Sequence, residues 1–142
     1  MQITLQITVL NPPAGVIFRM QRGRAELVEP SIADGDSISF DFDVRVAERD
    51  GNAPPRFLGP FTQGPPASRF VYVNSGKRAG QQESPWDRRA KVPLAGVTWA
   101  LIDQLLATPG AVLEARIAGT GRDGGPACAT IPLVGGWRLK RS

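Results

Sequence analysis

The sequence predicts a mostly β protein: an antiparallel β-sandwich or open barrel of about seven strands, with one short α-helix. Two observations support this fold class. Apolar and polar residues alternate one by one over several segments, which is typical of strands that turn one face to a core and the other to water. Clusters of Gly, Pro, Asp and Asn separate these segments, as turn residues do in sandwiches and barrels.

The clearest strands lie at the amino terminus and around residue 40. In the first strand, Ile3, Leu5, Ile7 and Val9 alternate with Gln and Thr. In the second, the same alternation runs over residues 37–46. Less regular strands are expected at residues 16–21, 25–29, 69–73, 92–94, 111–118 and 127–134.

One helix is expected at residues 98–107. Thr98 is a suitable N-cap residue, and Trp99, Ile102 and Leu106 form an apolar stripe at helical spacing. A Pro-Gly pair follows the stripe, and these residues end helices.

The whole chain, residues 1–142, is predicted to be a single domain, because 142 residues is an ordinary domain length. Residues 138–142 are mostly basic and are predicted to form a frayed tail. The opening segment has no basic region before its apolar residues, so it resembles a strand more than a signal peptide. With a single cysteine no internal disulfide can form, and a cytoplasmic location is expected.

The chain contains no histidine, which excludes several chemistries. Ser-His-Asp and Cys-His triads cannot be built, and a zinc site would need its ligands from one cysteine and carboxylates. No catalytic residue, cofactor or metal site is therefore predicted. Any acid–base chemistry would fall to Asp, Glu, Tyr or Lys.

Charge is unevenly distributed along the chain. Residues 1–50 contain 5 basic and 8 acidic side chains, a net of −3, and residues 51–142 contain 12 and 5, a net of +7. A basic face formed by the second part would favour anionic partners. The alternative is that the two parts of the chain interleave in the fold, so that their opposite net charges cancel over the protein surface.

Two long irregular segments flank the short strand at residues 69–73. Residues 53–68 contain five prolines, and residues 74–91 are polar and basic. Loops of this length are usually functional or disordered. We expect the two segments to fold toward each other at one rim of the β scaffold and to line a binding site, joined by the turn at residues 119–125.

The candidate ligand-binding residues in these segments are Gln63, Arg69, Tyr72, Lys77, Trp86, Arg88, Arg89 and Arg122. The basic side chains and Tyr72 would supply positive charge and hydrogen-bond donors, and carboxylate and phosphate groups are the usual ligands of arginine. Gln63 would orient the ligand, and Trp86 would stack on it.

Three other features have simpler explanations. Residues 119–124 spell G-x-G-x-x-G, but a β segment follows them where a phosphate cradle needs a helix. A hairpin turn is therefore favoured over an anion nest. Asp41 and Asp43 share one strand face about 7 Å apart, and solvent-facing carboxylates are favoured over an acid–base pair or a cation site. Cys128 lies between alanines and is expected to be a small buried residue.

Four segments together carry a resemblance: NPPAGVIF, FLGPFTQGPPASRFVYV, WDRRAKVPLAGVTW and GTGRDGGPACAT. Over nearly its whole length, the chain resembles a family of short bacterial proteins known only as a domain of unknown function. The resemblance implies a free-standing bacterial cytoplasmic protein. It brings no activity, substrate, cofactor or functional residue with it.

The predicted function is that of a non-catalytic binding module for a small polar or anionic molecule or a partner protein. One alternative is a small hydrolase or isomerase that uses a carboxylate with Tyr or Lys, which requires an Asp or Glu of raised pKa near Tyr72 or Lys77. A less favoured alternative is a nucleic-acid binder. No membrane partner is expected, and homodimerisation through a sheet edge stays open.

Overall fold

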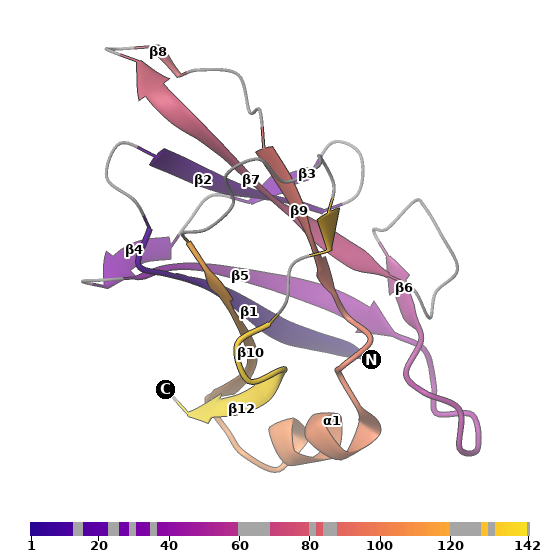
Figure 1. The fold of residues 1–142 in the computed structure, drawn as a ribbon. Coiled ribbons are helices and arrows are strands. Elements are labelled where there is room, and N and C mark those ends of the chain that lie inside the picture. Colours follow the sequence, from indigo (N-terminus) through magenta and orange to yellow (C-terminus); the bar gives the residue numbers. More distant parts are fainter. Residues whose placement is uncertain are drawn as a thin grey trace.

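The computed structural model describes residues 1–12, 16–22, 26–28, 31–34, 37–59, 69–79, 82–83, 88–119, 129–130 and 133–141. Within them, the strands form two six-stranded sheets that lie as two layers (Figure 1). Sheet A has the order β12 (Arg138–Arg141), β10 (Ala111–Ala118), β1 (Gln2–Leu10), β5 (Ser37–Val46) and β4 (Ser31–Asp34), and β6 (Phe57–Gly59) also pairs with β5. Sheet B has the order β11 (Ala129–Thr130), β9 (Arg88–Pro93), β7 (Phe70–Ala79), β2 (Val16–Arg22) and β3 (Glu26–Val28), and β8 (Gln82–Glu83) pairs with β7.

The predicted fold class is confirmed. Among the described residues, eight strands are four residues or longer, one helix is present, and the two sheets do not close into a barrel. The sheets are mixed rather than wholly antiparallel, because β1 pairs in parallel with β10 and β9 pairs in parallel with β11. Side chains alternate in the same way in both orientations, so the sequence pattern could not distinguish them.

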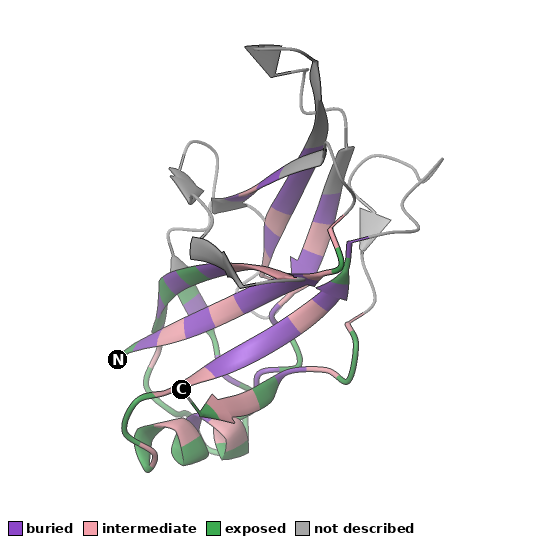
Figure 2. Ribbon diagram, turned by 90° about the vertical axis from the view of Figure 1, so that its left-hand side faces the viewer, coloured by how far each residue is buried: buried purple, intermediate pink, exposed green. Residues whose placement is uncertain are grey.

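The core lies between the sheets and is filled by alternate residues of the long strands. In β1 the buried apolar residues recur at every second position (Figure 2): Ile3, Leu5, Ile7 and Val9. In β5 they are Phe40, Phe42, Val44 and Val46, and in sheet B they include Phe18, Met20, Val71, Val73 and Val92. The predictions for the strands near residues 2–9 and 37–46 are confirmed.

The predicted helix is confirmed as α1 (Trp99–Leu106), which contacts β10 and β12 and lies at the bottom of Figure 1. The Thr98 side chain caps it, accepting a hydrogen bond from the backbone N of Leu101 at 3.2 Å. Ile102 is fully buried, and Trp99, Leu101 and Leu105 pack against the core. Leu106, the third residue of the predicted stripe, is exposed. In the part of the chain that is described, no helix has the length and apolar character needed to cross a membrane.

The turn that follows β5 is fixed to this helix. Nη2 of Arg49 lies 2.8 and 2.9 Å from the two carboxylate oxygens of Asp103. The Arg49 guanidinium also lies 4.6 Å from the ring centre of Trp99, whose indole N–H donates to the carbonyl of Ala53 at 2.9 Å. At the tip, Gly51 has a φ of +55°, which favours glycine.

The prediction of an irregular loop over residues 74–91 is wrong wherever the structure describes this segment. β7 continues to Ala79, and β9 begins at Arg88. The two strands pair with Asn74 opposite Arg89 and Ser75 opposite Arg88. A ladder is made by backbone groups and does not need apolar side chains, so a polar strand was mistaken for a loop.

The predicted hairpin between residues 111–118 and 127–134 is also wrong. β10 pairs with β1 and β12 in sheet A, whereas β11 pairs with β9 in sheet B. Residues 120–128, with most of the glycine motif and Cys128, lie outside the described residues. Gly119 is described: its N–H donates to the carbonyl of Leu10 at 2.7 Å, and a Cβ there would lie 2.6 Å from that oxygen. Glycine is therefore needed where β1 and β10 end side by side.

The predicted frayed tail is wrong for residues 138–141, which form β12. Leu139 lies opposite Leu113 of β10 and packs against the core. Arg138 and Lys140 form ion pairs with the buried Glu114. Arg138 and Lys140 thus belong to one face of an edge strand, and the charge of this segment did not indicate disorder.

Candidate functional site

The structure describes the eight predicted site residues to different extents. Three of them lie outside the described residues: Gln63, Trp86 and Arg122. For three others it describes the backbone: Lys77, Arg88 and Arg89. Arg69 and Tyr72 are described with their side chains, and both are half-exposed.

The strands β6 and β8, from the two segments that were expected to meet, lie at different ends of β7. Figure 1 shows β6, from the first segment, and β8, from the second, at opposite ends of this strand. Lys77 follows Tyr72 by five positions, about 16 Å along a strand. Tyr72 and Lys77 are therefore too far apart to contact one small ligand together. Residues 88–91 of the second segment run back along β7, with Lys91 opposite Tyr72.

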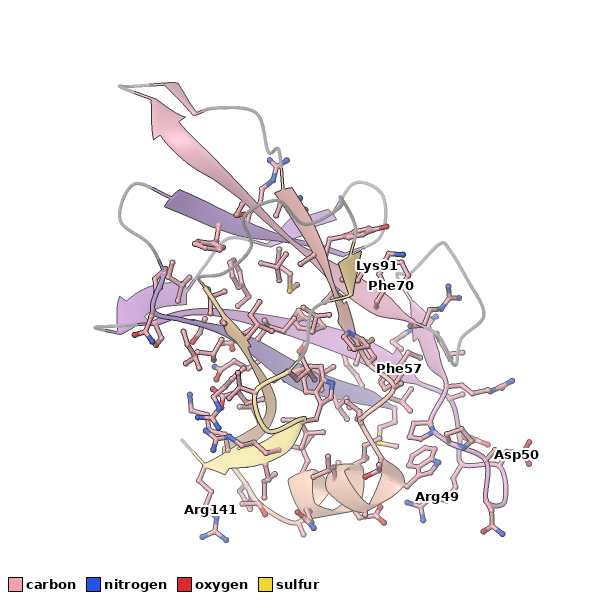
Figure 3. All side chains as sticks on the ribbon, in the orientation of Figure 1. Arg49, Asp50, Phe57, Phe70, Lys91 and Arg141 are labelled. Atoms are coloured by element: carbon pink, nitrogen blue, oxygen red, sulfur yellow. The ribbon has the colours of Figure 1, made fainter. Side chains whose placement is uncertain are left out.

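Tyr72 belongs instead to a smaller group on the outer face of sheet B. Val71 and Val73 point into the core, so Phe70 and Tyr72 point away from it. The two rings pack edge to face, with centroids 5.1 Å apart and planes at 75°. Lys91 of β9 lies opposite Tyr72, and its ammonium is 4.8 Å from the centre of the Phe70 ring (Figure 3).

We refer to Phe70, Tyr72 and Lys91 as the aromatic–lysine surface. All three are half-exposed. Arg19 of β2 lies on the same face. It is opposite Asn74, which follows Tyr72 by two positions on β7. Tyr72 was among the predicted site residues, but Phe70 and Lys91 were not, because their association depends on the pairing of β7 with β9.

A second polar group, centred on Glu114, lies on the outer face of sheet A and was not predicted. Glu114 is buried, at 2% exposure. Its Oε1 accepts hydrogen bonds from Nε and Nη2 of Arg138 at 3.2 and 3.0 Å. Its Oε2 accepts one from the Thr8 hydroxyl at 2.7 Å and lies 3.3 Å from the Lys140 ammonium. Lys140 also donates to Gln6 at 2.9 Å.

These contacts determine the charge of Glu114. Burial alone would raise the pKa of its carboxyl group, but the hydrogen bonds from Thr8 and Arg138 and the charge of Lys140 outweigh burial. The pKa therefore lies below its ordinary value. Glu114 stays ionised near neutral pH and is a poor proton acceptor. In the sequence, Glu114 occupies an ordinary polar position of an alternating strand, so the sequence does not indicate that it is buried.

Asp41 and Asp43 do share the outer face of β5, and both are exposed. The Thr4 hydroxyl donates to Asp43 at 2.6 Å, and the Gln6 amide donates to Asp41 at 2.8 Å. Each carboxylate is thus bound to the neighbouring strand, and the prediction that they face solvent is confirmed. Among the described residues, no group of three or more His, Cys, Asp or Glu side chains is arranged to hold a metal ion.

Residues 3–140 match the sequence model of a family described as "Family of unknown function (DUF5990)". The chain belongs to this family. The predicted membership of a family of unknown function is therefore confirmed. No curated protein and no solved structure matches the chain. Any function for this DUF5990 chain must accordingly be argued from its own geometry.

Proposed function

We propose that this protein is a non-catalytic binding module and that a small anionic molecule binds at the aromatic–lysine surface. The observation that supports this most is the grouping of two half-exposed aromatic rings with a lysine ammonium on the outer face of a sheet. Aromatic rings offer a large contact area at a small loss of conformational entropy. A ligand with one flat part and one anionic group matches this combination.

The lysine can be recruited by such a ligand. Its contact with Phe70 is worth about 0.5–1 kcal/mol at an exposed site. A hydrogen bond from an ammonium to an anion is worth about 1.5–3 kcal/mol, so an anion competes successfully for Lys91. Arg19 on the same face, together with the net charge of +7 over residues 51–142, adds to the attraction.

The enzyme alternative receives less support. It requires a carboxyl group of raised pKa near Tyr72 or Lys77. Among the residues whose burial is described, Glu114 is the one buried carboxylate. Its pKa is lowered, and it belongs to sheet A whereas Tyr72 belongs to sheet B. A cytoplasmic setting agrees with a single cysteine.

Tyr72 is the single tyrosine of the sequence, so fluorotyrosine labelling gives one fluorine NMR signal from the proposed site. Phenyl phosphate carries both a ring and an anion, and phenol and inorganic phosphate each carry one of them. We expect phenyl phosphate to shift the signal saturably and to bind more tightly than either of the other two. Lys91→Met should weaken its binding about tenfold or more.

Arg56→Met is the matched control, because Arg56 is exposed and lies outside the aromatic–lysine surface. Equal affinities of the Lys91→Met and Arg56→Met variants would contradict the proposal. Binding of oligonucleotides that weakens steeply with salt, in place of phenyl phosphate binding, would support the nucleic-acid alternative instead.

A further inference from the structure

Among the described residues, Arg116 is a charged side chain for which no ion pair is formed. It lies on β10, opposite Thr8 of β1, and is half-exposed. Its Nε is buried and has no hydrogen-bond acceptor among the described residues. Buried donors in native proteins are nearly always satisfied by protein, water or a ligand, so this position requires an explanation.

Glu114 is a candidate partner on the same strand, but the hydrogen-bond acceptor positions of its carboxylate are already filled. It lies two positions before Arg116 on the same face of β10. Its two oxygens receive four donor contacts, from Thr8, from Lys140 and twice from Arg138. A carboxylate has about four lone-pair positions, so none is left for a second guanidinium. Arg138 and Lys140 already give this one carboxylate two cations, and Arg116 on the same strand adds a third positive charge to the face.

The described chain beside Arg116 contains a turn of two glycines. Residues 134–136 run along β10, and the Val134 N–H donates to the Arg116 carbonyl at 2.8 Å. The next two residues, Gly135 and Gly136, have φ values of +80° and +68°. A Cβ on Gly135 would lie 3.7 Å from Nη2 of Arg116, and one on Gly136 would have no atom within 4 Å. This double-glycine turn therefore places no side chain over the guanidinium.

We propose that Arg116 forms an anion-binding site on the outer face of sheet A, beside the double-glycine turn, for a carboxylate or phosphate group. Nε is buried, so the guanidinium would bind the oxygens of such a group through Nη1 and Nη2. Arg138 and Lys140 strengthen the local positive potential, although their own donors are used by Glu114. The site is independent of the aromatic–lysine surface, which lies on sheet B.

The test uses the full chain labelled with nitrogen-15, because the Nε–H group of Arg116 can be observed directly by NMR. Sodium phosphate and sodium acetate are titrated in separate series, with chloride replaced so that the ionic strength is constant. We expect a saturable shift of the Arg116 Nε–H signal with at least one of these anions. If one anion alone produces it, that anion identifies the group recognised.

Two variants decide whether Arg116 is responsible. Arg116→Met keeps an unbranched apolar stem but removes the guanidinium, and it should weaken anion binding tenfold or more. Arg45→Met removes an exposed arginine of the same sheet face, on β5, and should leave the affinity within twofold of wild type. If Arg116→Met fails to fold, Arg116→Lys keeps the charge without the two-donor geometry, and its affinity should still fall.

Three results would overturn the proposal. The first is unchanged anion affinity in the folded Arg116→Met variant, or in Arg116→Lys. The second is an Nε–H signal that does not move while phosphate or acetate shifts other signals. The third is a response to chloride alone equal to the response to both oxyanions, which would indicate general screening of charge.

Discussion

Glu114 remains charged inside the protein because its neighbours replace the water that it loses. Burying an ionised carboxylate without partners costs several kcal/mol. Arg138 and Lys140 are 47% and 41% exposed, so water weakens their electrostatic contribution. The buried Thr8 hydroxyl, at 2.7 Å, is the partner that solvent does not weaken. At this residue, hydrogen bonds to the charged form matter more than ion pairing.

Acid should destabilise the protein through Glu114. Because its pKa in the folded state lies below the ordinary value, its contribution is complete above the ordinary pKa and is lost as the pH falls toward the folded pKa. We expect Glu114→Gln to lower the free energy of unfolding at neutral pH by about 1–3 kcal/mol. The same variant should show a flatter decline of stability in acid, measured by urea unfolding at a series of pH values. Asp41→Asn is the exposed control, and parallel curves for wild type and Glu114→Gln would contradict this prediction.

Among the strands and the helix, the sequence predicts those whose residue pattern lies within one short stretch of the chain. β1, β5 and α1 were predicted because alternation, a helical stripe and the Thr98 cap are all readable within about ten residues. The second half of β7 and all of β12 were missed, because polar strands are held by partners far away in the sequence. Asn74 pairs with Arg89, and Arg138 pairs with Glu114. Nothing in a polar segment indicates which strand it will join.

β12 should be a stabilising element of sheet A. Deleting residues 138–142 removes its ladder with β10, the partly buried Leu139 and two of the donors to Glu114. We expect the free energy of unfolding to fall by about 3 kcal/mol or more, measured by urea unfolding. Arg141→Met, at an exposed position, should change it by less than about 0.5 kcal/mol. A truncated chain as stable as the full chain would show that this segment is dispensable.

The contact between Arg49 and Asp103 should couple the turn after β5 to α1 weakly. Their side chains are 47% and 59% exposed, and exposed ion pairs are worth about 0.2–1 kcal/mol. A double-mutant cycle with Arg49→Met and Asp103→Asn should give a coupling energy in this range. Strict additivity of the two substitutions would mean that the contact with Trp99, and not the ion pair, holds Arg49 in place.

For the molecule as a whole, the fold class could be predicted but the arrangement of the strands could not. Alternation of apolar and polar residues indicates that a strand has one buried and one exposed face. It specifies neither the order nor the direction of the strands in a sheet. The predicted site depended on that order. Tyr72 was identified from its place beside long polar segments, whereas Lys91, Glu114 and Arg116 gain their roles from neighbours on other strands. Predicting them would have required the pairing of β1, β9 and β12 in advance.

The parallel pairing of β1 with β10 has a consequence for synthesis of the chain. About 100 residues separate the two strands, so the ribosome, at about 5–20 residues per second, needs roughly 5–20 s between them. Throughout that interval the edge of β1 that later pairs with β10 has no partner strand. A nascent chain that stalls before residue 111 would expose this edge to other unfinished chains, and aggregation or retention by chaperones would follow.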